Sequence, residues 1–258
     1  MNSLMDNESL SEYINNLKYK SVGLNSSQNR AYSCPICKDR KSILYEKNGI
    51  EYARTCECFN KDIIEARIKK SGLSEKFINN SFENYDVRDN LKLSEIKNKV
   101  YNYALFVTKD NLSEVSSLYL GGQVGAGKTH LGIACSKVLI EKGIQVIYIQ
   151  YREKFTKLKY LLFSRKDDYF KEIDYFQNAE MLYIDDFFKG KVNEWDINIM
   201  YEIINYRYNN NKPFIISSEH YLNNIIKIDK GLGGRILEMC SDNYINFVGK
   251  ELNYRILS

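Results

Sequence analysis

The segment GGQVGAGKTH, residues 121–130, constrains the fold more than any other part of the sequence. Residues 122–129 fit the pattern G-x-x-x-x-G-K-[ST], directly after an apolar run and directly before an amphipathic one. Glycines at these places let backbone N–H groups turn inward around phosphates, and the start of the next helix adds its positive dipole end. The segment therefore predicts a nucleotide-phosphate loop between a strand and a helix.

The pattern also predicts roles for individual loop residues. Lys128 is expected to reach the β- and γ-phosphates of ATP, and Thr129 to hold Mg²⁺. The other loop residues expected to contact the nucleotide are Gly122, Gly125, Ala126, Gly127 and His130. We do not expect His130 to bind a metal, because no second histidine or acid stands at ligand spacing.

Around this loop, short apolar runs alternate with amphipathic ones. The predicted strands are 117–121, 145–150, 181–185, 213–217 and 243–249, and the predicted helices between them are 129–143, 152–163 and 196–209. Such alternation is typical of an α/β fold in which helices cover both faces of a parallel sheet. We therefore predict a P-loop core with a central parallel sheet between helices.

An acidic pair follows the third predicted strand. In MLYIDDFF, Asp185 is placed to bind Mg²⁺ and Asp186 to orient the water that attacks ATP. Taken alone, such a pair could equally be a solvated turn. Together with the upstream loop, it favours the second half of an ATPase site.

Four cysteines form a second constellation, C-x2-C-x18-C-x-C. Cys34, Cys37, Cys56 and Cys58 could supply four thiolates from two tight turns to a structural zinc ion. The alternatives are two unrelated thiol pairs or a redox pair, although no thioredoxin-like pattern surrounds them. A small module with few large apolar residues needs a cross-link to stabilise its fold, which favours the zinc site over the alternatives.

Two unequal domains follow from these motifs. We predict an N-terminal module at 1–75 with the zinc site and an ATPase domain at 76–258. Within the module, apolar residues at 10–17 predict a short helix, and residues 61–72 a second helix closed by Gly72. The start lacks a signal-peptide pattern and no apolar run could span a bilayer, so a cytoplasmic protein without a membrane partner is expected.

Read in order with YEIINYRYNNNKPFIISSE (201–219) and GLGGRILEMC (231–240), these motifs resemble bacterial or phage replicative helicase loaders of the DnaC/DnaI type. The resemblance covers nearly the whole chain and is densest from Phe82 to Gly249. It implies an AAA+ ATPase core, a zinc-bearing module that binds a hexameric replicative DNA helicase, and binding of single-stranded DNA. It also implies self-assembly when ATP is bound, with ATP hydrolysis releasing the loader from the helicase.

The resemblance further assigns Arg235 as an arginine finger, which completes a neighbouring subunit's site and makes hydrolysis depend on assembly. The alternative for Arg235 is an ordinary surface arginine. Phe82 and Tyr85 of SFENY match the family's linker and are placed near the adenine, although aromatic residues in a linker are often simple packing.

Two positions depart from the family pattern. Glu219 stands where AAA+ proteins usually carry Asn, and an acid there would repel the γ-phosphate unless it is metal-bound or turned away. Ser218 could serve in its place, and we expect hydrolysis to be slow. Asp186 stands where many relatives of the wider superfamily carry Glu and has a shorter reach.

Residues 150–166 mix cations with rings, as single-strand binding requires. An apolar stripe on the same helix makes a core helix with a solvated basic face equally reasonable. The net charge of +4 permits a basic patch without proving one.

Two other functions fit the same core. An IstB-like ATPase helper of DNA transposition is the main alternative, and the cysteine module argues against it. A small-molecule kinase would share the phosphate loop, but an arginine-rich lid is not evident.

Overall fold

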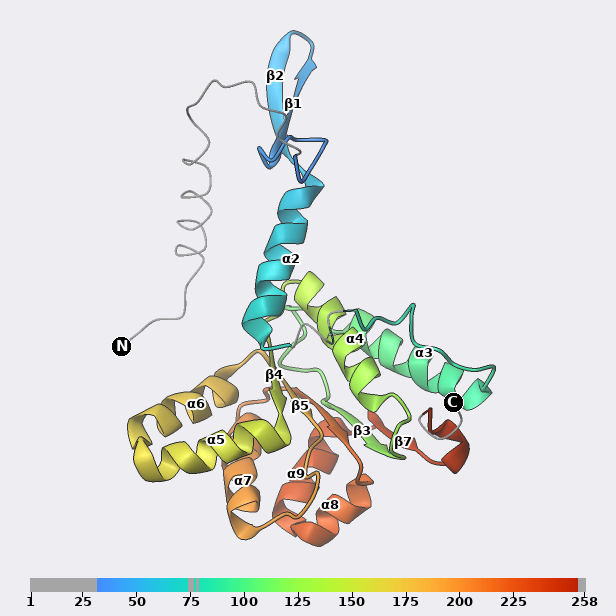
Figure 1. Ribbon diagram of the computed structural model, residues 1–258, viewed down its shortest axis with the longest axis vertical. Helices are drawn as coiled ribbons and strands as arrows, with labels where there is room; N and C mark the ends of the chain where they lie inside the picture. The colour runs from blue at the N-terminus through green and yellow to red at the C-terminus, as the bar shows by residue number, and fades with distance from the viewer. Residues whose placement is uncertain (1–31, 74–76, 78, 255–258) are drawn as a thin grey trace. The chain divides into compact units, whose positions relative to one another are not determined.

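The structure, a computed structural model, describes residues 32–73, 77 and 79–254 (Figure 1). The helix predicted within residues 10–17 lies outside these ranges. The chain divides into two compact units, Met1–Glu65 and Ala66–Ser258, so the division falls inside a helix, α2 (Glu57–Ser71). No helix in the described part of the chain combines the length and apolar character that crossing a bilayer requires.

In the first unit a β-hairpin lies between the two cysteine pairs. Strands β1 (Ser42–Lys47) and β2 (Ile50–Thr55) pair antiparallel, with Lys47 opposite Ile50. The two-residue turn has positive φ at both Asn48 (54°) and Gly49 (74°), the backbone of a tight hairpin turn. Helix α2 begins at Glu57, between the two cysteines of the second pair, so Cys58 lies in its first turn. It begins four residues earlier than predicted and ends just before Gly72, as predicted.

The second unit is built on a five-stranded parallel sheet. Its strands are β3 (Leu118–Gly122), β4 (Val146–Gln150), β5 (Met181–Asp185), β6 (Phe214–Ser218) and β7 (Tyr244–Phe247). Their spatial order is β4-β5-β6-β3-β7, and every neighbouring pair is parallel. All five predicted strands and their parallel arrangement are confirmed.

Helices cover both faces of this sheet (Figure 1). Helices α3 (Leu91–Phe106) and α4 (Lys128–Glu141) lie on one face. On the other face lie α5 (Tyr151–Ser164), α6 (Lys166–Asn178), α7 (Glu194–Asn209), α8 (Leu222–Ile228) and α9 (Lys230–Cys240). A short 3₁₀ helix, η2 (Lys250–Leu252), follows β7. Of these helices, α4, α5 and α7 match the three helices predicted from the sequence for this domain.

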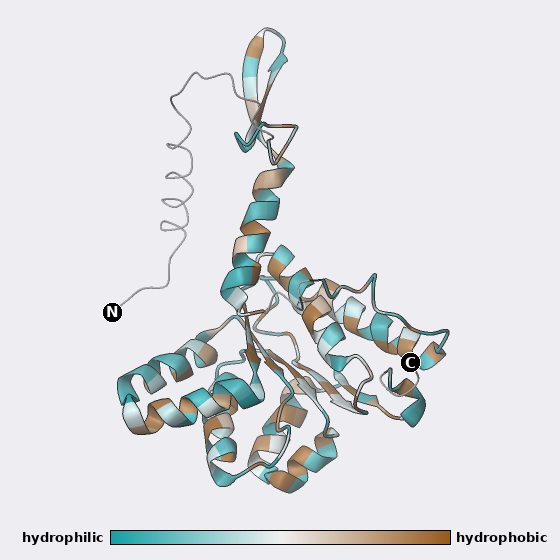
Figure 2. Ribbon diagram, viewed as in Figure 1, coloured by the Kyte–Doolittle hydropathy of each residue, from teal (hydrophilic) through white to brown (hydrophobic). Residues whose placement is uncertain are grey.

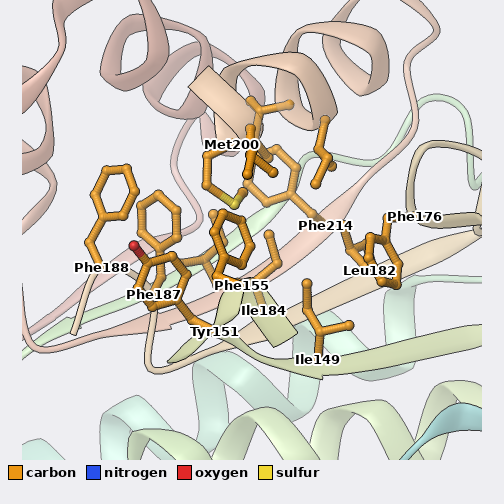
Figure 3. Close-up of a cluster of buried hydrophobic side chains, with 14 of the residues drawn as sticks. Ile149, Tyr151, Phe155, Phe176, Leu182, Ile184, Phe187, Phe188, Met200 and Phe214 are labelled. Atoms are coloured by element: carbon orange, nitrogen blue, oxygen red, sulfur yellow. The ribbon is translucent and has the colours of Figure 1, made fainter. Parts of the chain in front are cut away.

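The strands of the sheet consist mostly of hydrophobic residues (Figure 2), as expected where helices cover both faces. Every residue of β3, β5 and β6 is buried. On one face, Ile149, Leu182 and Ile184 of the sheet belong to a cluster with Phe155 of α5 and Met200 of α7 (Figure 3). This cluster places α5 in the hydrophobic core. The sequence alone had left open whether this helix packs in the core or binds DNA.

A buried cation fixes the end of α6. Arg207 is fully buried, and its guanidinium donates to the carbonyl oxygens of Phe176 (2.7 Å), Gln177 (3.2 Å) and Ala179 (3.0 Å). It also donates to the carbonyl of Pro213, which precedes β6. Carbonyls at a helix C-terminus lack intrahelical donors, so this arginine satisfies them and ties α7 to α6 and β6.

Leu158→Ala tests the burial of α5. Leu158 is fully buried, and we expect the truncation to lower the free energy of unfolding by about 2–5 kcal/mol through lost burial and the cavity left behind. Chemical denaturation measures this. Tyr160→Ala on the exposed side of the same helix is the control, with a change within about 0.5 kcal/mol. Equal effects of the two variants would contradict the packing described.

Candidate functional site

The phosphate loop connects β3 to the start of α4. Gly127 caps α4 with φ +80°, in the left-handed region that favours glycine. A Cβ at this position would lie 2.4 Å from a ring carbon of Tyr85. The Lys128 ammonium donates to the carbonyls of Gly122 (2.8 Å) and Gln123 (2.6 Å). Burial lowers the pKa of Lys128 to about 8, although the charges of nearby carboxylates act to raise it.

Asp185, the last residue of β5, accepts hydrogen bonds from four hydroxyls. Thr129 donates to its Oδ1 at 2.8 Å, so the two predicted Mg²⁺ ligands already touch. Tyr183 donates to the same oxygen at 3.1 Å, and Ser217 does so as well. Tyr148 donates to Oδ2 at 3.1 Å. A carboxylate and a hydroxyl oxygen are hard donors that suit Mg²⁺, so this pair fits the ion.

Asp186 and Glu219 share one cation. The Lys189 ammonium lies 3.1 Å from Oδ2 of Asp186 and 3.2 Å from Oε1 of Glu219. Burial acts to lower the pKa of Lys189, but its hydrogen bonds and charge interactions with the two carboxylates outweigh this and raise it above the ordinary value. Lys189 was missed by sequence reasoning, since it follows the acidic pair without belonging to a recognised motif.

These groups line one cavity of about 550 Å³. The predicted site residues on its wall are Gly125, Ala126, Gly127, Lys128, Thr129, His130, Asp185 and Asp186. Glu219 and Lys189 also line it. A cavity of this size suits a nucleotide, and its phosphate-loop end carries both the cations and the acids that phosphoryl chemistry uses.

Two tyrosines, Tyr85 and Tyr254, also line the cavity, where both contact the phosphate loop. Tyr85 donates to the carbonyl of Ala126 at 2.9 Å and meets the ring of His130 edge to face at 5.3 Å. Tyr254, which was not predicted as a site residue, donates its N–H to the carbonyl of Gly125 at 3.0 Å. Phe82 is buried against Tyr101 instead, at a centroid distance of 5.0 Å.

Three predicted site residues do not line the cavity. Gly122 contributes only its carbonyl, to Lys128. The Ser218 hydroxyl donates to the carbonyl of Phe187 at 2.7 Å, and the neighbouring Ser217 is the serine that reaches Asp185. Arg235 lies on α9, where its Nε donates to Oδ1 of Asn205 at 2.8 Å. The chain alone therefore does not bring Arg235 to the phosphates.

The four cysteines of the first unit converge. Their sulfur atoms all lie within 4.8 Å of one another. The Cys34 and Cys56 sulfurs are 3.8 Å apart, and those of Cys37 and Cys58 are 3.3 Å apart. Four sulfurs on a tetrahedron around zinc are about 3.8 Å apart for Zn–S bonds of about 2.3 Å. The cluster therefore fits a closed zinc site.

The basic residues of α5 mostly have acidic partners. Lys154 and Lys157 contact the Glu172 carboxylate at 3.1 and 3.2 Å, and Lys159 contacts Asp196 at 2.7 Å. Arg152 is exposed. The rings of Tyr151 and Phe155 are buried in the core, whereas Tyr160 and Phe163 of α5 and Trp195 of α7 are exposed.

Comparison with known proteins agrees with this fold. Residues 74–239 match the family model described as the bacterial DnaA ATPase domain. The phage-like element PBSX protein XkdC of Bacillus subtilis (strain 168) is 33% identical over 243 residues, covering 87% of this chain and 86% of that protein. The crystal structure of the DnaC helicase loader matches with a TM-score of 0.58 and 24% identity, covering 68% of this chain and 100% of that one. DnaI matches with a TM-score of 0.55 and 19% identity, covering 69% and 93%. The expected resemblance to these loaders is confirmed at the level of the fold.

Gly127→Ala tests the phosphate loop. A non-glycine residue in the left-handed region costs about 1–2 kcal/mol, so we expect nucleotide affinity to fall by about tenfold or more. The clash with Tyr85 adds to this. Titration with a fluorescent ATP analogue measures the affinity. Gly234→Ala, where a Cβ meets open space, is the control and should bind like the unmodified chain. If Gly127→Ala binds the ATP analogue as tightly as the unmodified chain, the assignment of this segment as the phosphate-binding loop is wrong.

Proposed function

Because the chain belongs to the bacterial DnaA ATPase domain family and has an AAA+ fold, we propose that it is an ATP-switched loader of a replicative DNA helicase. The contact between Thr129 and Asp185 in the nucleotide-sized cavity carries the ATPase part of the proposal. The fold likeness to the DnaC helicase loader and the cysteine cluster support the loader part.

In the proposed reaction, the second unit binds ATP and hydrolyses it. Lys128 exchanges its bonds to the carbonyls of Gly122 and Gln123 for phosphate oxygens. Thr129 and Asp185 would hold Mg²⁺, which would neutralise charge on the phosphates. The Asp186 carboxylate orients the attacking water.

Arg235 acts in this proposal on a neighbouring copy of the chain. It lies outside the cavity of its own chain, on α9. There its guanidinium packs over the rings of Tyr201 (4.8 Å) and Tyr208 (5.5 Å). Stacking of this kind holds an arginine in a defined direction. Hydrolysis would then depend on assembly, because each site needs its neighbour's guanidinium.

The first unit is the proposed helicase-binding module. Its hairpin and cysteine turns expose several large apolar side chains, namely Ile36, Leu44, Tyr45, Ile50 and Tyr52. Exposed apolar residues gathered on a small unit are typical of protein interaction surfaces. A zinc ion on the four cysteines would fix the turns that present them.

Single-stranded DNA is the second proposed partner of the ATPase unit. The rings of Phe163 and Trp195 meet edge to face at 5.5 Å, and Tyr160 is exposed on the same helix as Phe163. Exposed rings of this kind can stack on bases. Lys157 is more than half exposed in its ion pair, and exposed pairs are weak, so a DNA phosphate can replace the carboxylate at little cost.

Native mass spectrometry of the full chain with its organism's replicative helicase tests the loader function. We expect a zinc-retaining complex, because the folded module presents the binding surface. Cys37→Ser should lose both the zinc and the complex. Lys128→Ala should keep both and lose only the response of single-strand binding to ATP. If no complex forms under any nucleotide condition, the loader function is wrong.

Mixing two inactive variants tests the arginine finger. Arg235→Ala and Asp185→Ala should each hydrolyse little ATP alone. In an equal mixture, random head-to-tail pairing gives about a quarter of the interfaces both an intact site and an intact finger, so partial activity should return. A steady-state ATPase assay measures the recovery. Mixtures as inactive as the separate variants would show that Arg235 does not act in trans.

A further inference from the structure

Lys189 occupies a position that the phosphate-loop chemistry does not explain. Its ammonium bridges Asp186 and Glu219 on the wall of the nucleotide cavity, at 3.1 and 3.2 Å. The three side chains are 33%, 25% and 31% exposed, so their charges are only partly screened by water. Neither carboxylate was expected to share a cation.

The charge balance at the phosphate end of the cavity depends on this lysine. Asp185, Asp186 and Glu219 bring three carboxylates there, against the ammonium groups of Lys128 and Lys189. Without Lys189, three acids would face a single cation in a site meant for a polyanion. Carboxylates that line the same cavity repel phosphate and raise the free energy of its binding.

The turn that carries Lys189 is held in a defined shape. Both Asp186 (φ 55°) and Phe188 (φ 57°) adopt left-handed backbone conformations. The rings of Phe187 and Phe188 stack at 4.1 Å and are fully buried. The N–H of Phe187 donates to the carbonyl of Ser217 at 2.8 Å, and that of Lys189 donates to the carbonyl of Asp186 at 3.0 Å. This anchoring places Lys189 over the two acids rather than in solvent.

We propose that Lys189 is a positioning residue for ATP hydrolysis, which neutralises Glu219 beside the terminal phosphate and holds the Asp186 carboxylate in place. The proposal rests on the proposed ATPase function. It explains how Glu219 is tolerated where an uncharged side chain is usual: the acid is paired with a lysine supplied by the turn after β5. Lys189 therefore acts on two separate quantities, nucleotide affinity through Glu219 and turnover through Asp186.

Lys189→Met separates these two effects. We expect KM for ATP to rise and kcat to fall, each by about tenfold, the usual scale for losing a charge-assisted hydrogen bond. Adding Glu219→Gln to this variant should restore KM, because the uncompensated acid is removed. It should leave kcat low, because Asp186 still lacks its partner. Lys189→Arg should recover much of both values.

The control is Lys191→Met, which removes an exposed lysine two residues away that does not line the cavity. It should behave like the unmodified chain. Thermal melting of each variant and titration with a fluorescent ATP analogue accompany the kinetics. If Lys189→Met fails to fold, the test uses Lys189→Arg and the single variant Glu219→Gln. For Glu219→Gln we expect a KM for ATP that is unchanged or lower.

Three outcomes are distinguishable. Unchanged kinetics in Lys189→Met would overturn the inference, and so would a raised KM that Glu219→Gln does not restore. If the unmodified chain binds and hydrolyses ATP no better than Lys128→Ala, the proposed ATPase function itself fails. A restored KM with a persistently low kcat supports the assignment, since a purely structural role for Lys189 would move both values together.

Discussion

The parallel pairing of β6 with both β3 and β5 is the constraint on which the rest of the site depends. Since all three strands run in the same direction, their carboxyl ends meet at one edge of the sheet. The phosphate loop leaves β3, the acidic pair ends β5, and Ser217 and Glu219 come from the end of β6. The hydrogen bond between Thr129 and Asp185, separated by 56 residues in sequence, is the direct result.

Much of this architecture could be predicted from the sequence because its signals are local. The phosphate loop carries its own glycine pattern, and the five apolar runs alternate with helices in the order that a parallel sheet requires. The hairpin between the cysteine pairs was missed, although Asn48 and Gly49 form the two-residue turn that such hairpins favour. Its strands are largely exposed and lack the alternation of apolar and polar residues that marks a half-buried strand.

The parts of the site that sequence reasoning missed are those that depend on tertiary packing. Tyr148, Tyr183 and Ser217 read as ordinary strand residues, and only the sheet register brings their hydroxyls to Asp185. Glu219 could be recognised as a departure from the family pattern, but its partner Lys189 lies 30 residues earlier in the chain. The proposed role of Arg235 in completing an ATPase site involves a second copy of the chain, so it cannot be seen in the structure of a single chain.

The hydroxyl donors around Asp185 also bear on which ion can enter. A solitary magnesium ion would have to displace well-placed donors from the carboxylate while giving up part of its tightly held hydration shell. Magnesium that arrives already chelated by a triphosphate brings phosphate oxygens with it and can keep most of its waters. Under the proposed function, occupancy of this carboxylate by Mg²⁺ would therefore depend on the presence of the triphosphate.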